Sequence, residues 1–370
     1  MKATGIITEY SPFHNGHIYH IQKTRELLKP DCLIATISGN FTMRGAISSI
    51  EKYHKAQLAL NHGVDLVVEI PFPYVNQQAD YFAYGAISLL EQLSVTDFCF
   101  GSEANDLKKL QEKLDYAKTV NYQKALKANL KKGLSYSQSS MKTIDENIQS
   151  NDILGISYLK AIENLKANLK PYTIQRVKSN HRDTTPNDSS IASATALRNL
   201  DDISFYVPKE VTDYKNKYGF SDLSDFFSLL HYKLGTTEAN ELKDYLHVNE
   251  GIENLFKKKL VNNYNEFIAS IQTKRYTANR INRTLISILT EFKQDIFKLE
   301  PVPYINILGF NESGRKYLNK LKKEKQDLIF LPQKKDFTNP ILSLSRKADF
   351  IYYAHSKSPK PLSPIYNTHN

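Results

Sequence analysis

The sequence has few cysteines, no long hydrophobic run and no recognisable leader segment. Its two cysteines, Cys32 and Cys99, are isolated, which argues against a disulfide framework and indicates a reducing compartment. No stretch approaches the ~20 consecutive apolar residues that a membrane-spanning helix requires. Glu9 and the histidines after it interrupt any apolar segment that a signal peptide would need. We therefore expect a cytoplasmic protein with no membrane partner.

Acidic residues are scarce in the last third of the chain. The 370 residues carry a formal net charge of +10, and residues 257–370 contain 21 Lys and Arg against 9 Asp and Glu. All of the positive excess therefore lies in this part, while the first 256 residues are nearly neutral. A neutral region joined to a basic one favours a polyanionic partner, and we expect nucleic acid. A lysine-rich solvated surface is the alternative interpretation.

The first seventeen residues carry the most specific pattern. Residues 5–7 are typical of a buried strand, a Ser-Pro pair marks a turn, and His14-Asn15-Gly16-His17 opens a helical pattern. The free N–H groups and the positive dipole end of a helix attract an anion. Two imidazoles one turn apart can donate hydrogen bonds to the same oxyanion, and Gly16 lets a nucleotide approach the backbone. The pattern predicts a phosphate site.

Two other interpretations of these histidines stay open. His14, His17 and His20 have a three-residue spacing that could suit zinc, but the two isolated cysteines do not supply the further ligands such a site needs. The histidines could also simply cap and pack the helix. We favour the phosphate site because the pattern follows a first strand, and we expect no metal held by the protein alone.

Strand-like and helix-like segments alternate over the first 200 residues. Strands are expected at residues 33–37, 66–70, 97–100 and 172–177, and helices at 52–61 and 86–93. This rhythm predicts an α/β fold with a doubly wound, Rossmann-like parallel sheet, in which ligands bind beyond the carboxyl ends of the strands. Polar and glycine residues gather at those ends, at Thr8, Glu9, residues 38–40 and 101–103, and Arg176.

The second half of the chain is predicted to be mainly helical. A polar segment at residues 178–190 is followed by a helix with Ser193 as its N-cap, from which Arg198 could reach the anion held by the helix amides near Ser193 and Thr195. Further helices are expected at residues 223–234, 238–246, 252–273 and 278–297, and residues 356–370 are expected to fray. We therefore divide the chain into a nucleotide-binding catalytic domain, 1–200, and a helical basic region, 201–370.

These motifs together resemble the nucleotidylyltransferase superfamily with a His-x-Gly-His signature. The signature is His14-Asn15-Gly16-His17, and residues 191–198 resemble the second phosphate motif, with Ala192 and Ala194 as departures from it. A closer resemblance, over residues 1 to about 315, is to the bacterial tRNA(Met) cytidine acetate ligases. The segments that carry it are residues 9–17, 38–41, 44–45, 69–73, 100–103, 151–155 and 274–281.

The resemblance implies an ATP-dependent ligase. Such an enzyme forms acetyl-adenylate from acetate and ATP and transfers the acetyl group to N4 of the wobble cytidine of elongator tRNA(Met). His14 and His17 would be the catalytic residues that stabilise phosphate charge, with Mg²⁺ bridging phosphate oxygens mostly through water. The residues expected to bind ATP are Ile7, Thr8, Glu9, Tyr10, Ser11, Pro12, Phe13, His14, Asn15, Gly16, His17, Ile18, Tyr19, His20, Gly101, Asn151, Arg176, Ser193, Thr195 and Arg198.

The basic region supplies candidates for binding tRNA. A helix-prone segment carries four cations and an aromatic residue that could stack on a base, namely Lys274, Arg275, Tyr276, Arg280 and Arg283. A solvated basic helix with a core tyrosine is the alternative interpretation. Lys52, Arg44 and Lys23 are further candidates.

Two other functions remain as alternatives. One is an adenylyltransferase acting on a small phosphorylated coenzyme precursor, and the other is a non-catalytic RNA-binding protein that keeps a nucleotide pocket. The basic last third favours tRNA modification over the first alternative, and the two intact histidines favour an enzyme over the second.

Overall fold

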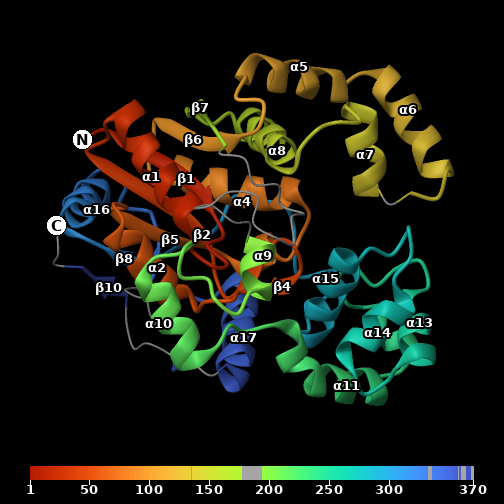
Figure 1. Ribbon diagram of the computed structural model, residues 1–370. Helices are drawn as coiled ribbons and strands as arrows, with labels where there is room; N and C mark the ends of the chain where they lie inside the picture. Colours follow the sequence, from red (N-terminus) through yellow and green to blue (C-terminus); the bar gives the residue numbers. More distant parts are fainter. Residues whose placement is uncertain (135, 177–193, 332–335, 357, 360–363, 368–370) are drawn as a thin grey trace.

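An eight-stranded sheet forms the centre of the protein. The structure, a computed structural model, describes residues 1–134, 136–176, 194–331, 336–356, 358–359 and 364–367. The strand order along the sheet is β10-β8-β5-β2-β1-β6-β7, with β9 pairing to β8. Figure 1 shows the sheet with helices on both faces and two further groups of helices to one side.

Five parallel strands make the part of the sheet that the sequence predicts. They are β1 (Ala3–Thr8), β2 (Cys32–Ser38), β5 (Leu66–Ile70), β6 (Asp97–Ser102) and β7 (Lys170–Gln175). The chain adds β2 and β5 on one side of β1 and then β6 and β7 on the other, so the strand order reverses next to β1. The prediction of a doubly wound parallel sheet is confirmed.

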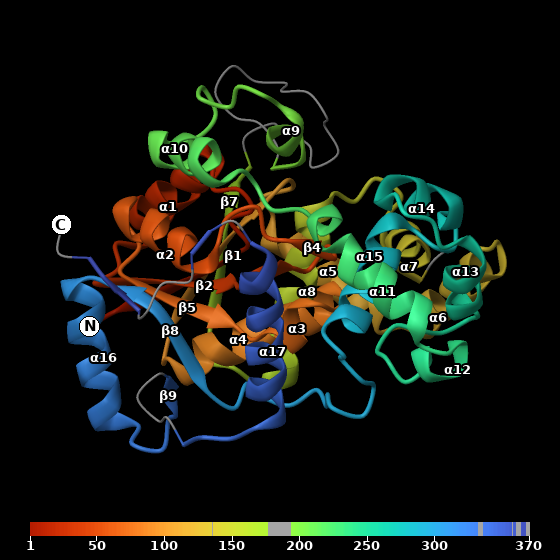
Figure 2. The ribbon, with the colours of Figure 1, turned by 90° about the horizontal axis from the view of Figure 1, so that it is seen from below.

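Alternate side chains of the strands pack into two helical layers. Ile7, Ile34 and Val68 join a core with α4 (Ala79–Gln92), α8 (Ser150–Leu165) and α16 (Glu312–Glu324). Ile6 and Ala35 point the other way, toward α1 (Asn15–Leu28), α2 (Lys52–Asn61) and α10 (Lys209–Tyr218). Figure 2 shows these two layers on opposite sides of the sheet. The strands β2 and β5 are mostly apolar because both faces of the sheet are covered there.

The end of the chain returns to this sheet, which the sequence analysis does not predict. β8 (Ile305–Phe310) lies antiparallel beside β5, and β9 (Phe330–Leu331) and β10 (Ile365–Tyr366) pair with β8. α17 (Pro340–His355) packs nearby against α3 (Phe72–Val75). A boundary at residue 200 places these strands outside the sheet, so that division needs correction. The change to a mainly helical pattern after residue 200 predicts this division, but β8 owes its place to pairing with the distant β5.

Residues between the sheet segments form a separate helical group. It contains η1 (Leu223–Phe226), α11 (Phe227–Thr236), α12 (Ala239–Leu242), α13 (Ile252–Lys259), α14 (Tyr264–Ile271) and α15 (Ala278–Leu289). Phe226, Phe256 and Phe267 lie at its core. The helix expected at residues 252–273 is divided, because the Asn263 side chain caps a new helix at α14. The helix expected at 278–297 ends at Leu289.

Six further elements complete the fold. The helices α5 (Leu107–Ala117), α6 (Val120–Lys131) and α7 (Tyr136–Ile144) lie between β6 and α8 and are not predicted from the sequence. A hairpin of β3 (Phe41–Thr42) and β4 (Ala46–Ile47) follows β2, and α9 (Ala194–Asn199) precedes α10. Within the ranges that the structure describes, every helix is too short or too polar to cross a bilayer.

Candidate functional site

A cavity of about 230 Å³ lies where the strand order reverses. In doubly wound sheets this position, beyond the carboxyl ends of the strands, is where ligands bind. We call it the central cavity. The predicted ATP-binding residues that line it are Ile7, Thr8, Glu9, Tyr10, Ser11, His14, Gly16, His17, Tyr19, His20, Gly101, Asn151, Arg176 and Arg198.

Several predicted residues do not line the central cavity. Phe13 is buried and its ring packs against the His17 ring, while the Asn15 side chain donates to the carbonyl oxygen of Phe205. Pro12 forms the turn before α1, and Ile18 packs against the core beneath α1. Ser193 lies outside the described residues, as does the side chain of Thr195. The second phosphate motif is therefore described only from its helix, α9, onward.

His14 and His17 begin helix α1 in a reciprocal arrangement. Nδ1 of His14 accepts the backbone N–H of Gly16 at 3.1 Å, and Nδ1 of His17 accepts the backbone N–H of His14 at 3.1 Å. The two rings stack with their centroids 3.7 Å apart. Because each Nδ1 accepts a hydrogen bond, the proton of each neutral ring is on Nε2. The helix start thus fixes two imidazole N–H donors side by side on the central cavity.

The charge at this site comes from arginine and not from His14. Burial, with a smaller contribution from Arg176, lowers the pKa of His14 to about 3, so this ring is neutral near pH 7. Arg44, Arg176 and Arg198 all line the same cavity. Burial lowers the pKa of Arg176 and of Arg198, and the Arg44 guanidinium lowers both further. Three cations that repel one another around one cavity fit a polyphosphate ligand.

The carboxyl end of β6 is held in place by the start of α8. The carboxylate of Asp152 accepts hydrogen bonds from Ser102 Oγ and from the backbone N–H of Glu103 at 3.0 Å. The neighbouring Asn151 donates its side-chain amide to Glu103 Oε1. A Cβ on Gly101 would lie 3.2 Å from Cγ of Arg176, so glycine leaves room beside that side chain. Asp152 is a positioning residue that the sequence analysis does not identify, and its place directly after Asn151 is the available signal.

Apolar and aromatic residues cover another part of the cavity wall. Phe82, Phe100, Leu154 and Tyr158 line it beside the polar residues. A wall of this kind suits a flat aromatic base, while the histidines and arginines suit phosphate. These four residues have no sequence signal of their own, because apolar residues in helices and strands read as core.

His20 gives the site a testable pH dependence. Burial lowers its pKa to about 4, and its Nε2 has no hydrogen-bond partner within the described residues. The unfolded chain takes up this proton near pH 6.5, whereas the folded protein takes it up only near pH 4. The free energy of unfolding should therefore fall as the pH drops through this window, by at most about 1.4 kcal/mol per pH unit for this one group.

Urea unfolding at several pH values between 4 and 7 measures this effect. The variant His20→Gln should lose part of the wild-type slope, because glutamine does not titrate. His355→Gln, at an exposed position on α17, is the matched control and should keep the wild-type slope. Equal slopes for wild type and His20→Gln would refute the assignment.

The predicted tRNA-binding residues comprise exposed cations and residues that contact other parts of the protein. Lys274 and Arg275 are exposed, and Arg275 pairs with Glu250 at 2.9 Å. Tyr276 is only 8% exposed and its hydroxyl donates to the Glu250 carbonyl oxygen at 2.6 Å, while Arg280 lies over its ring. The expectation that Tyr276 stacks on a base is corrected, because its ring is part of the helical core.

Arg283 and the three further candidates for binding tRNA all contact other parts of the protein or line the central cavity. Arg283 Nη1 donates to the carbonyl oxygen of Met43, in the hairpin between β3 and β4. Lys52 is 2% exposed and buried against acidic partners, so it is not available to RNA. Lys23 pairs with Glu26 on α1, and Arg44 lines the central cavity.

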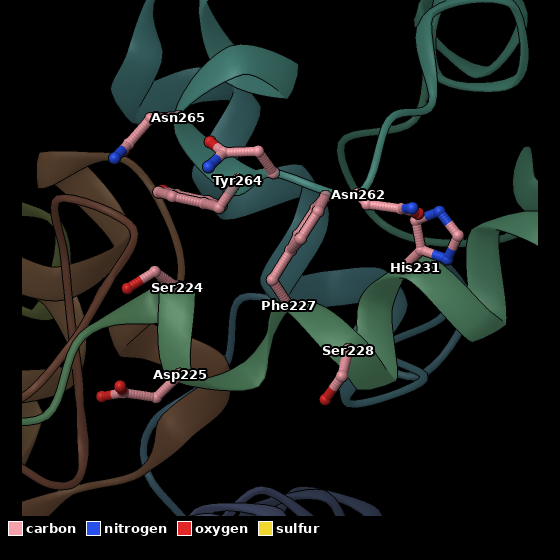
Figure 3. A pocket seen from close by; sticks show the side chains of 9 residues that line it. Ser224, Asp225, Phe227, Ser228, His231, Asn262, Tyr264 and Asn265 are labelled. Carbon is pink, nitrogen blue, oxygen red and sulfur yellow. The ribbon is translucent and has the colours of Figure 1, made fainter.

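A second cavity, of about 590 Å³, lies in the helical group (Figure 3). Its walls come from η1, α11 and the start of α14, and most of its side chains are neutral and polar, such as Ser228, Asn262 and Asn265. Asp225 is the one carboxylate among its lining residues, and that lining includes no lysine or arginine. This cavity therefore does not suit a polyphosphate. Across the described ranges, no three His, Cys, Asp or Glu residues are grouped to hold a metal ion.

Comparisons with known proteins agree with the geometry. A family model described as HIGH Nucleotidyl Transferase matches residues 1–363. The tRNA(Met) cytidine acetate ligase of Anoxybacillus flavithermus is 37% identical over 390 aligned positions, covering 98% of this chain and 96% of that protein. The protein of the same description from Clostridium novyi is 36% identical over 406 positions, covering 99% and 100%.

Two solved structures share the fold of this chain over its whole length. The apo form I of Thermotoga maritima TmcAL superimposes with a TM-score of 0.89 at 28% identity, and both chains are covered completely. TmcAL of the same organism bound with alpha-thio ATP gives a TM-score of 0.87 at 29% identity, also over 100% of both chains. The chain is thus an enzyme that belongs to the HIGH nucleotidyl transferases and, among them, to the family of the tRNA(Met) cytidine acetate ligases.

Proposed function

We propose that this chain is a cytoplasmic enzyme that activates acetate with ATP and acetylates N4 of the wobble cytidine of elongator tRNA(Met). The observation that carries the proposal is the pair of Nε2–H donors on His14 and His17 beside the arginines of the central cavity. The names of the relatives supply the acceptor, and the nucleotide held by the Thermotoga maritima protein supports ATP as the ligand. In this proposal the lining residues of the central cavity bind ATP.

The first step is attack of an acetate oxygen on the α-phosphorus, with pyrophosphate as the leaving group. Acetate is already ionised at pH 7, so the step needs no general base. His14 and His17 donate hydrogen bonds to α- and β-phosphate oxygens, while Arg198 and Arg44 neutralise the triphosphate. Among the described residues, Glu9 is the one carboxylate that lines the cavity, and burial raises its pKa. Magnesium therefore fits as part of the MgATP substrate, held by phosphate and water.

The second step joins the acetyl group to the tRNA. The exocyclic N4 amine of cytidine attacks the carbonyl carbon of acetyl-adenylate, AMP leaves, and the nitrogen loses a proton. The exposed cations Lys274 and Arg275 sit just before α15 and are the proposed contacts to the tRNA backbone. Arg275 and Arg280 both pair with Glu250 at 2.9 Å, so a contact of either guanidinium with the tRNA backbone competes with that carboxylate.

One assay separates this function from its alternatives. The protein is incubated with MgATP, labelled acetate and bulk tRNA, and label is measured in tRNA and in small molecules. Label in tRNA as N4-acetylcytidine supports the proposal. Transfer of AMP to a phosphorylated small acceptor would instead support an adenylyltransferase, and the absence of any turnover would support a non-catalytic RNA-binding protein.

The proposed tRNA contacts predict a strong salt dependence of binding. Between about 50 and about 200 mM salt, the affinity for tRNA should fall at least about tenfold, because each phosphate contact releases a counterion. The double variant Lys274→Ala/Arg275→Ala should show a smaller slope of log Kd against log salt. Lys320→Ala on α16, an exposed cation far along the chain from this segment, is the control. Binding that does not respond to salt would contradict the role.

A further inference from the structure

We propose that the β3–β4 hairpin is clamped onto α15 in order to hold Arg44 in the central cavity, and that Arg283 is a positioning residue in this clamp. The inference rests on the proposed function only in taking ATP as the ligand of the cavity. It assigns Arg283 to nucleotide binding, through Arg44, and not to RNA.

The backbone of Met43 connects the hairpin both to the residue after β1 and to α15. Its backbone N–H donates to Glu9 Oε1 at 2.7 Å, and its carbonyl oxygen accepts from Arg283 Nη1 at 3.2 Å. One peptide unit on each side of Met43 is thereby tied to the end of β1 and to α15. Burial and the nearby Arg280 lower the pKa of Arg283 to about 10, which still leaves it charged at pH 7. A guanidinium held between two protein segments is not a typical RNA contact.

Gly45 brings the hairpin tip against the backbone of α15. Its φ of +75° is in the left-handed region, and its N–H closes the turn by donating to Thr42 O at 3.0 Å. A Cβ at this position would lie 2.7 Å from the backbone nitrogen of Arg283 and 2.9 Å from the carbonyl oxygen of Asn279. The contact is therefore backbone to backbone, and Figures 1 and 2 both show β4 beside α15.

The helix α15 is itself fixed to the sheet domain. The side chain of Asn76, which follows α3, donates to the carbonyl oxygen of Arg283 at 3.2 Å and to Ser287 Oγ at 3.0 Å. Ser287 Oγ in turn donates to the same carbonyl at 3.0 Å. These hydrogen bonds fix α15 relative to the sheet domain at this point, so the β3–β4 hairpin can be held against α15.

Arg44 lies between the two clamped residues. It follows Met43, precedes Gly45 and lines the central cavity. Its guanidinium makes no hydrogen bond or ion pair to any residue that the structure describes, and it lines the same cavity as Arg176 and Arg198, whose pKa values it lowers. Glu9 attracts this guanidinium electrostatically, and the backbone that carries the side chain is held through Met43, Gly45 and Arg283.

A double-mutant cycle on ATP affinity tests the clamp. Arg44→Ala and Arg283→Ala should each raise the Kd of ATP about tenfold, as expected when a charged contact to phosphate is lost. If Arg283 acts through Arg44, the double variant should bind no worse than Arg44→Ala alone. Arg283→Lys, which can still donate one hydrogen bond to Met43 O, should stay within about threefold of wild type. Gly45→Ala should weaken ATP binding as Arg283→Ala does.

A matched control separates positioning from general destabilisation. Lys257 donates to the carbonyl oxygens of Leu234, Gly235 and Thr237 within the helical group and does not contact the hairpin. Lys257→Ala should lower the melting temperature without changing the Kd of ATP. Additive losses in the Arg44/Arg283 double variant, or an unchanged Kd in Arg283→Ala, would overturn the clamp. A wild-type protein that fails to bind ATP would overturn the proposed function together with it, so the two failures are distinguishable.

Discussion

Replacing His14 or His17 by alanine is expected to reduce acetyl-adenylate formation by about 10²-fold or more. The two rings place Nε2–H donors on the cavity because each Nδ1 is already occupied by a backbone N–H. Fixed donors of this kind stabilise charge that develops on the phosphate oxygens in the transition state, and loss of one such donor has effects of this size. Acetate-dependent exchange of pyrophosphate into ATP measures the step without tRNA.

The loss should appear mainly in kcat, because the donors act most strongly on the transition state. His14 stays neutral throughout the physiological range, since its pKa lies at about 3. The ratio of wild-type to His14→Ala rates should therefore be constant between about pH 6 and pH 8. His14→Gln, which retains an N–H donor, should recover part of the activity, and His355→Ala on α17 should exchange normally. Exchange near the wild-type rate in His14→Ala or His17→Ala would remove that residue from the mechanism.

Replacing Lys52 by methionine should lower the free energy of unfolding by about 3–5 kcal/mol, the largest stability effect that we expect. The Lys52 ammonium lies 3.0 and 2.9 Å from the two carboxylate oxygens of Glu69 and also pairs with Asp349. Burial opposes its charge, but Asp349 and Glu69 together hold the pKa of Lys52 well above its usual value. Without the lysine, the buried Glu69 carboxylate and the partly buried Asp349 carboxylate lose their shared cation.

Urea unfolding of Lys52→Met at pH 7 measures this loss. Lys23→Met provides the comparison, because Lys23 pairs with Glu26 at an exposed position and the substitution should change stability far less. The double variant Lys52→Met/Glu69→Gln should recover part of the stability, since it removes one of the two stranded charges. A loss in Lys52→Met no larger than in Lys23→Met would show that the ion cluster is not a major stabilising element.

The helices and strands around the site could be predicted from sequence where the local pattern of apolar and polar residues agrees with which side chains the fold buries. The strand at residues 3–8 and the helix from Asn15 follow from an apolar run, a turn and a capping pattern. The expectation that Lys52 contacts RNA is wrong because this lysine is buried, whereas an isolated lysine is usually solvated. The signal that could have placed it is Glu69, a carboxylate inside the apolar strand β5, which requires a buried cation.

Long-range pairing accounts for most of what the sequence analysis missed. The strands β3, β4, β9 and β10 have two residues each, too few for a periodic pattern, and β8 gains its place from contact with a strand far away in the chain. The sequence shows the charge of Arg44 but not its position, so it predicts an RNA contact where the structure has a residue of the cavity wall. Tyr276 shows the reverse case, in which an aromatic residue within a basic segment belongs to the core.

The antiparallel pairing of β8 with β5 has a consequence for synthesis on the ribosome. Glu69 and its partner Asn306 are separated by 237 residues, and at about 5–20 residues per second that stretch takes roughly 10 to 50 s to make. Throughout this time β5, which is apolar except for Glu69, has an unpaired edge that can add a strand from another nascent chain. The yield of native protein should therefore depend on a chaperone, or on a low concentration of nascent chains, more than on the stability of the finished fold.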